Sequence, residues 1–173
     1  MEGLLTLEIK AMLEDIVGQC FYNNRMFDRI VSILSVPMVM PSTSNIVHQR
    51  MAHAYPQLAD IISDYMADRD CTTIYRETPI GDQDYETPLE CFNMMLQCNL
   101  DLEKKVINAI KKSESTGDYT TKVNLDSFLI IVYILTKDIM TLIDKAEMYG
   151  DAKISWMKFD HDVEDFGLKE EYI

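Results

Sequence analysis

The sequence is poor in positive charge. It contains 16 Lys and Arg residues against 29 Asp and Glu residues, which gives a formal net charge of −13. A chain with this balance repels the phosphates of nucleic acids unless its cations are clustered. The basic residues form only short pairs such as Lys104-Lys105 and Lys111-Lys112. We therefore expect no nucleic acid among the partners of this protein.

The sequence also lacks a long apolar run. A helix that crosses a bilayer needs about 20 predominantly apolar residues, and the run Phe128–Leu135 is far shorter. No basic stretch precedes an apolar segment around Leu4 and Leu5, as it would in a secretion signal. These absences predict no membrane association and a cytoplasmic location.

Paired cysteines are missing as well. Cys20, Cys71, Cys91 and Cys98 form no Cys-x-x-Cys motif. A chain of this size without a secretion signal is expected to keep its cysteines as free thiols rather than as a disulfide framework. We expect them to be reduced and mostly buried.

Helical periodicity dominates what the sequence does contain. Apolar residues recur every three to four positions over residues 4–35, and the same spacing returns in later segments. The sequence predicts four long helices and a short one, over residues 4–35, 43–69, 88–113, 119–148 and 155–166. No linker or repeat divides them, so we expect a single domain over residues 1–173.

Two segments interrupt this pattern. Pro56 lies inside the second predicted helix and has no amide proton to donate, so the helix should kink there or begin near Ala54. Residues 70–87 contain Pro79 and Gly81 without helical periodicity, which predicts an extended crossover. A long connection lets successive helices run parallel. The predicted fold is therefore all-α, a four-helix bundle with a crossover between its second and third helices and a short C-terminal helix.

The apolar run Phe128–Leu135 is the most unusual part of the predicted fourth helix. Taken alone it could be a buried strand, but Leu142 and Ile143 continue the helical phase beyond it. We predict a helix. Tyr22, Tyr55 and Tyr133 are expected to point inward, where their hydroxyls need partners such as Asp15, Asn23 or Asn99.

Short motifs in the second half of the chain occur in a distinctive order and spacing. They are Asp64-Tyr65, Tyr85, Pro88-Leu89-Glu90-x-Phe92, Asp118-Tyr119-x-Thr121, Leu142-Ile143-Asp144-Lys145, Gly150 and Phe159-Asp160. Together they resemble the bacterial non-haem ferritins, and the first half of the chain matches through Asp15 and Tyr22. The resemblance implies a ferritin-like bundle. Members of that family form hollow multi-subunit cages that oxidise ferrous iron at a paired-metal site inside each bundle and store the oxide.

The resemblance also implies where the metal ligands would fall. A paired iron site needs hard oxygen donors and an imidazole, usually including a Glu-x-x-His motif. The glutamate of the first helix falls on Asp15, whereas the other ligand positions fall on Tyr55, Leu58, Asn99, Ile131, Ile134 and Leu135. No Glu-x-x-His motif occurs in the chain. We therefore expect a ferritin-like subunit that lacks an intact ferroxidase centre inside the bundle.

Other ligand sets stay open. A di-metal oxidase could use a rearranged set consisting of Asp15, Glu14, His48, His53 and Asp101. On an α-helix, however, His48 and His53 are about 140° apart and cannot easily share one metal ion. His48 with Asp64 and Asp68 also resembles the miniferritins that protect DNA in starved cells, whose ligands meet across a dimer interface.

The C-terminal segment offers one more candidate. Asp160, His161 and Asp162, followed by Glu164 and Asp165, could bind a divalent cation, although a solvated acidic tail has the same composition.

The sequence as a whole favours a role in iron storage or cage structure with little ferroxidase activity. Iron is the cofactor that the resemblance suggests, although the residues themselves do not require it. We expect a homo-oligomer, from a dimer up to a cage, which could also assemble with an active ferritin chain. A third interpretation is a binding module that holds an organic ligand inside the bundle or in a dimer groove.

Overall fold

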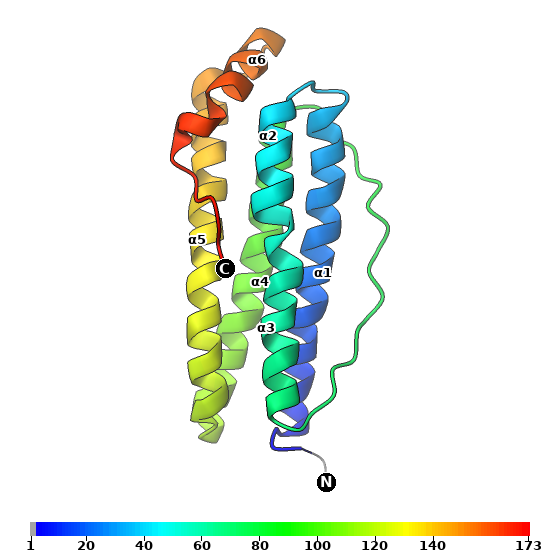
Figure 1. Ribbon diagram of the computed structural model, residues 1–173, viewed down its shortest axis with the longest axis vertical. Helices are drawn as coiled ribbons and strands as arrows, with labels where there is room; N and C mark the ends of the chain where they lie inside the picture. The colour runs from blue at the N-terminus through cyan, green and yellow to red at the C-terminus, as the bar shows by residue number, and fades with distance from the viewer. Residues whose placement is uncertain (1–2) are drawn as a thin grey trace.

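Four helical rods stand side by side in the computed structural model, which describes residues 3–173 (Figure 1). The elements are α1 (Leu7–Ser35), α2 (Pro41–Ile46), the π-helix η1 (Val47–Ala52), α3 (Ala54–Asp68), α4 (Pro88–Thr116), α5 (Tyr119–Tyr149), α6 (Lys153–Asp162) and the 3₁₀-helix η2 (Val163–Phe166). Elements α2, η1 and α3 together form the second rod. The predicted all-α bundle with a long crossover and a short C-terminal helix is confirmed. None of the helices in residues 3–173 has an apolar stretch long enough to cross a bilayer.

The beginnings of the long helices are fixed by side chains that the sequence places there. The hydroxyl of Thr87 accepts a hydrogen bond from the Glu90 amide (3.2 Å), directly before Pro88 at the first helical position. Asp118 caps α5 in the same way by accepting from the Thr121 amide (3.1 Å). These caps satisfy amides that have no partner inside the helix, which sets where α4 and α5 begin.

Residues 70–87 cross from the end of α3 to the start of α4 along one side of the bundle (Figure 1). The segment has no regular structure, and polar contacts attach it to α1. Arg29 donates to the Gln83 carbonyl (2.8 Å), and Arg76 donates to Asp15 (2.8 Å). The crossover therefore covers α1 and supplies one cation, Arg76, to the carboxylate of Asp15.

The second rod changes its helical type halfway along its length. Pro56 cannot donate to the carbonyl of Ala52, which would be its partner in an α-helix. The side-chain amide of Asn24 on α1 donates to that carbonyl instead (3.0 Å). One turn earlier the rod widens into η1, where the His53 amide donates to the His48 carbonyl five residues before it (3.2 Å). As the position of Pro56 predicts, α3 begins at Ala54.

The core follows the helical periodicity on all four rods, but the apolar run of α5 is buried on one side only. Phe128, Val132 and Leu135 face the core, whereas Ile130 and Tyr133 are 51% and 52% exposed. The expectation that Tyr133 points inward is therefore wrong. The run has apolar residues around the whole helix, so its pattern could not show which side faces the bundle.

The last residues form a tail that returns along the bundle after η2 and ends beside its middle (Figure 1). Leu168 and Tyr172 are buried. The carboxylate of Asp138 on α5 accepts hydrogen bonds from the Lys169 amide (2.9 Å) and the Tyr172 hydroxyl (2.6 Å). The tail is thus a packed part of the fold that the sequence pattern did not predict.

Candidate functional site

A hydrogen-bonded network crosses the middle of the bundle with contributions from every rod. The Tyr55 hydroxyl of α3 donates to Oδ1 of Asn99 on α4 (2.8 Å). The Asn99 amide in turn donates to the Val132 carbonyl of α5 (2.9 Å) and to the Thr136 hydroxyl (2.8 Å). Asn23 of α1 donates to the Cys98 carbonyl (3.0 Å). Asn23, Tyr55 and Asn99 are fully buried.

Every group in the centre of this network is neutral. Burial raises the pKa of the Tyr55 hydroxyl well above its ordinary value, so the phenol keeps its proton. The amide of Asn99 uses both its oxygen and its nitrogen on protein partners. A buried polar group is tolerated when its hydrogen bonds are made inside the protein, which is the case here without any ion. The Tyr55, Asn99 and Thr136 hydrogen bonds therefore join α3, α4 and α5 through neutral groups, while Asn23 joins α1 to α4 beside them. A carboxylate meets these groups at Thr136, whose hydroxyl also donates to Glu103 of α4 (3.3 Å).

The remaining positions suggested by the resemblance are apolar. Leu58 and Leu135 are fully buried, and Ile131 and Ile134 are partly buried against the core. None of these four side chains carries an atom that can coordinate a metal ion. The arrangement at the middle of the bundle consists of aliphatic packing around the Tyr55–Asn99 hydrogen bond.

Asp15 and Glu14 lie on α1 near the crossover rather than in the centre. The carboxylate of Asp15 contacts Arg76 (2.8 Å) and Lys105 (2.6 Å). Glu14 accepts from the Ile74 amide (3.1 Å) and contacts Lys10 (3.1 Å). Both carboxylates are therefore already neutralised by cations or amides of the chain.

The histidines of the rearranged set lie elsewhere. His48 and His53 are on the outside of the second rod, close to Asp28 of α1. Asp28 is thirteen residues from Asp15 on the same helix, a distance of about 20 Å. Asp101 of α4 accepts from its neighbour Gln97 (3.0 Å). The structure does not bring the five residues of the set together, and no three His, Cys, Asp or Glu side chains in residues 3–173 are placed to hold one metal ion.

One part of the sequence argument about the histidines is wrong. The estimate of about 140° between His48 and His53 assumes an α-helix. His48 lies inside the π-turn η1 and His53 directly follows it, and their ring centroids are 4.5 Å apart in an edge-to-face arrangement. The two imidazoles are therefore neighbours on one face.

The acidic C-terminal segment has structural roles. Asp160 is buried and accepts from the backbone amides of Thr43 (2.7 Å) and Ser42 (3.2 Å) at the start of α2. Asp162 accepts from the Tyr149 hydroxyl (2.6 Å), and its pKa is lowered by hydrogen bonds from His161 and then Tyr149. The candidate cation cluster is thus divided, because Asp160 caps α2 while Asp162 holds α6 against α5.

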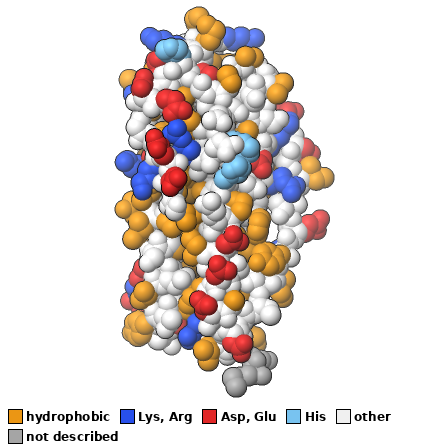
Figure 2. Space-filling view, in the orientation of Figure 1, with side chains coloured by type: hydrophobic (Ala, Val, Ile, Leu, Met, Phe, Trp, Pro, Cys, Tyr) orange, Lys and Arg blue, Asp and Glu red, His pale blue; other side chains and the backbone are white. Residues whose placement is uncertain are grey.

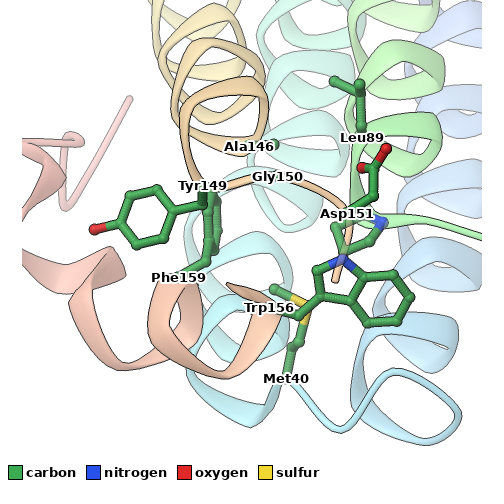
Figure 3. Close-up of a pocket in the computed structure, with 9 residues that line it drawn as sticks. Met40, Leu89, Ala146, Tyr149, Gly150, Asp151, Trp156 and Phe159 are labelled. Carbon is green, nitrogen blue, oxygen red and sulfur yellow. The ribbon is translucent and has the colours of Figure 1, made fainter. Parts of the chain in front are cut away.

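A small cavity lies between α6 and the adjacent end of the bundle (Figure 3). It is lined by Trp156, Asp151, Tyr149, Phe159 and neighbouring residues, and its volume is about 10 Å³. That volume is about the space of one water molecule. A cavity of this size cannot accommodate an organic ligand, so this cavity gives no support to the binding-module interpretation.

All four cysteines are free and buried, as the sequence predicts. Burial raises the pKa of Cys91 and of Cys98 to about 12 and raises that of Cys20 as well. Since the thiolate is the reactive and metal-binding form, these thiols are poor nucleophiles and poor ligands.

The fold is closely similar to solved ferritin structures. No protein-family model and no curated protein matches the sequence. An open-pore ferritin from the hyperthermophilic archaeon Archaeoglobus fulgidus superposes with a TM-score of 0.86 at 12% identity, covering 96% of this chain and 99% of that one. A humanized archaeal ferritin gives 0.86 at 13% identity, with 96% and 98% coverage. An engineered closed form of the Archaeoglobus fulgidus ferritin gives 0.85 at 11% identity, with 96% and 99% coverage.

The chain has the ferritin fold. At these identities the similarity establishes the architecture, and the chemistry of this ferritin-fold chain has to be argued from its own residues. Sequence reasoning named Tyr55, Asn23 and Asn99 as members of an internal polar network, but it missed Thr136 and the tail contact of Asp138. Thr136 follows the apolar run and Asp138 lies within a helix, and nothing in the sequence around either residue indicates which group it contacts.

Proposed function

We propose that this ferritin-fold chain is a non-catalytic subunit of an iron-storage assembly, with no ferrous oxidation inside its own bundle. The observation that supports this proposal is the neutral network of Asn23, Tyr55, Asn99 and Thr136 at the middle of the rods. A paired iron site would need several carboxylates and an imidazole in a dry interior. The described side chains offer amides, hydroxyls and aliphatic groups there instead, with the Glu103 carboxylate reaching the Thr136 hydroxyl (3.3 Å) and no imidazole beside it.

The energetics favour a bundle that is stable without metal. Unpaired carboxylates in a protein interior cost several kcal/mol each, roughly, unless a cation compensates them. An aliphatic side chain at the same place stabilises the fold by roughly 1.5 to 3 kcal/mol through burial. With Leu58 and Leu135 buried and the Asn99 hydrogen bonds satisfied, folding of this subunit does not depend on iron.

Self-association is supported by the outer face of α5. Val123, Ile130, Tyr133 and Met140 are apolar and are each about half exposed or more. Their successive spacing of seven, three and seven residues places them on one side of the helix. Apolar faces of this kind usually mark contacts between proteins. We propose that a second copy of the chain covers this face in a homo-oligomer.

Iron storage is the part of the proposal that depends most on assembly. The net charge of −13 gives a strongly acidic molecule, and acidic surfaces that enclose a volume concentrate ferrous and ferric ions. A monomer encloses no such volume. Co-assembly with an oxidising ferritin chain would supply the oxidation step that this subunit lacks.

The decisive experiment measures ferrous oxidation by the purified protein under air, with a ferritin that has an intact oxidation centre as the positive control. We expect the rate to equal that of buffer at two ferrous ions per chain. Rapid oxidation at that ratio would contradict the proposal. Light scattering should show an oligomer. A monomeric wild type would contradict the assembly part, and the double variant Ile130→Glu, Tyr133→Glu should shift an oligomer toward smaller species.

A further inference from the structure

The outside of the second rod carries a feature that the proposed function does not use. The π-turn η1 closes over five residues, with the His53 amide donating to the His48 carbonyl (3.2 Å). The imidazole rings of these two residues consequently lie against one another, with centroids 4.5 Å apart. In a regular α-helix the same spacing would separate them.

The fold holds this turn in place from its inner side. Val47, Met51 and Ala52 of η1 are fully buried. The Ala52 carbonyl, which Pro56 leaves without a helical partner, accepts from Asn24 of α1 (3.0 Å). The wide turn is therefore anchored in the core, and the spacing of the two histidines on its outer side is a built-in property of the rod.

The surroundings of the pair suit a cation. Histidine side chains gather in one patch about halfway along the rod, where solvent can reach them (Figure 2). The Asp28 carboxylate lies 4.0 Å from Nε2 of His48. The Gln49 side-chain amide nitrogen lies 3.2 Å from Nδ1 of His48, and this exposed side chain has to turn away for Nδ1 to bind a metal ion. The whole chain is strongly acidic, which attracts cations to its surface.

We propose that His48 and His53 together bind one divalent transition-metal ion of the kind that prefers nitrogen ligands, with water completing its coordination. Imidazole nitrogens suit Cu²⁺, Ni²⁺ and Zn²⁺. Since no three potential ligands are preassembled in the described part of the chain, this is a two-ligand site.

Asp28 is a positioning residue at this site. In metal sites a carboxylate commonly accepts a hydrogen bond from the ring nitrogen of histidine that does not bind the metal, and this fixes the orientation of the ring. A small side-chain rotation would bring Asp28 from 4.0 Å to hydrogen-bonding distance of His48. The site lies outside the bundle, so it does not rest on the proposed function.

The test titrates the full chain with Zn²⁺ alone by calorimetry and with Cu²⁺ alone by electron paramagnetic resonance. We expect one Zn²⁺ per chain and a Cu²⁺ spectrum with splitting from two nitrogens. Either His48→Gln or His53→Gln should weaken Zn²⁺ binding at least tenfold and reduce the splitting to that of one nitrogen.

Matched variants separate this site from general binding to an acidic surface. His161 is exposed on α6, away from the pair, so His161→Gln should leave the affinity unchanged. Asp28→Asn should weaken binding a few-fold while keeping both nitrogens in the Cu²⁺ spectrum, and Asp28→Glu should restore the affinity. Unchanged binding in both single variants of the pair, or an equal loss in His161→Gln, would overturn the proposal. Neither result would alter the outcome of the ferrous oxidation assay.

Discussion

The middle of the bundle and its rim near the crossover both contain polar side chains that need partners, but the partners differ in charge. In the middle, Tyr55 and Asn99 pair through neutral groups where water is excluded. At the rim, Asp15 is paired with Arg76 and Lys105 where water still reaches it. Charge pairs are tolerable where solvent screens them and expensive where it does not. The comparison indicates that the Tyr55–Asn99 pair in the middle is neutral, whereas the charged pairs of α1 lie where solvent reaches them.

The largest effect should come from placing a charge in the middle. Asn99→Asp would bury a carboxylate and remove the donor to Val132 and Thr136, which should lower the free energy of unfolding by about 3–5 kcal/mol at pH 7. Burial raises the pKa of the new carboxyl above its unfolded value, so the loss should shrink as the pH falls toward 4. Urea unfolding at several pH values measures this.

Asn93 provides the matched control for this substitution, because it is exposed on the same helix. Asn93→Asp should change the stability by less than about 0.5 kcal/mol. If Asn99→Asp were as stable as Asn93→Asp at pH 7, the description of a charge-free middle would be wrong.

Removing one hydrogen bond from the middle should have a smaller effect. Tyr55→Phe keeps the aromatic packing against Phe27 but leaves Oδ1 of Asn99 without its donor. We expect a loss of about 1–2 kcal/mol in the free energy of unfolding. Tyr133→Phe is the control and should leave the free energy of unfolding almost unchanged, because Tyr133 is half exposed. Equal losses at the two tyrosines would show that the internal hydrogen bond contributes nothing to stability.

Removing the hydrogen bond that holds the C-terminal tail should have a still smaller effect at neutral pH, and this effect depends on pH. Burial, followed by the hydrogen bond to Asp138, raises the pKa of Tyr172. An unfolded tyrosine ionises near pH 10, so the folded chain loses stability as the pH rises above that value. Tyr172→Phe should cost about 1 kcal/mol at pH 7 and should weaken this alkaline loss by up to about 1.4 kcal/mol per pH unit.

Alkaline unfolding curves of the two proteins check this difference, with Tyr119→Phe as the control because Tyr119 is exposed. Parallel curves for wild type and Tyr172→Phe between pH 9 and 11 would mean that the tail does not hold Tyr172 in the folded state.

The smallest effect is expected at the rim. Asp15→Asn breaks the contacts with Arg76 and Lys105, but these groups are partly exposed, so the loss should stay below about 1 kcal/mol and shrink further in high salt. Thermal unfolding at low and high salt measures it. A loss as large as that of Asn99→Asp would remove the distinction between rim and middle.

The helices could be predicted from the sequence, because each is stabilised by one apolar face whose residues recur with a regular period. The sequence was also sufficient for the break at Pro56, whose missing amide is a local property. It was insufficient for η1, because the replacement donor Asn24 comes from another helix. The position of His53 beside His48 depends on that turn, so a spacing rule for α-helices gave the wrong geometry.

Contacts between side chains far apart in the sequence could not be predicted either. Asp160 looked like part of an acidic cluster, yet it caps α2 more than a hundred residues earlier in the sequence. The Asp138 contact with the tail and the Thr136 contact with Asn99 are of the same kind. For the apolar run of α5, periodicity could not separate the core face from the face that we propose a second copy covers.

The burial of all four cysteines makes site-specific labelling of this protein simple. Since Cys20, Cys71, Cys91 and Cys98 are all shielded by packing, a single cysteine engineered at an exposed position outside the proposed α5 contact face, such as Ser115 of α4, would be the fastest thiol to react with a maleimide dye. Energy transfer between dyes on neighbouring subunits could then follow assembly in real time without first removing the native cysteines.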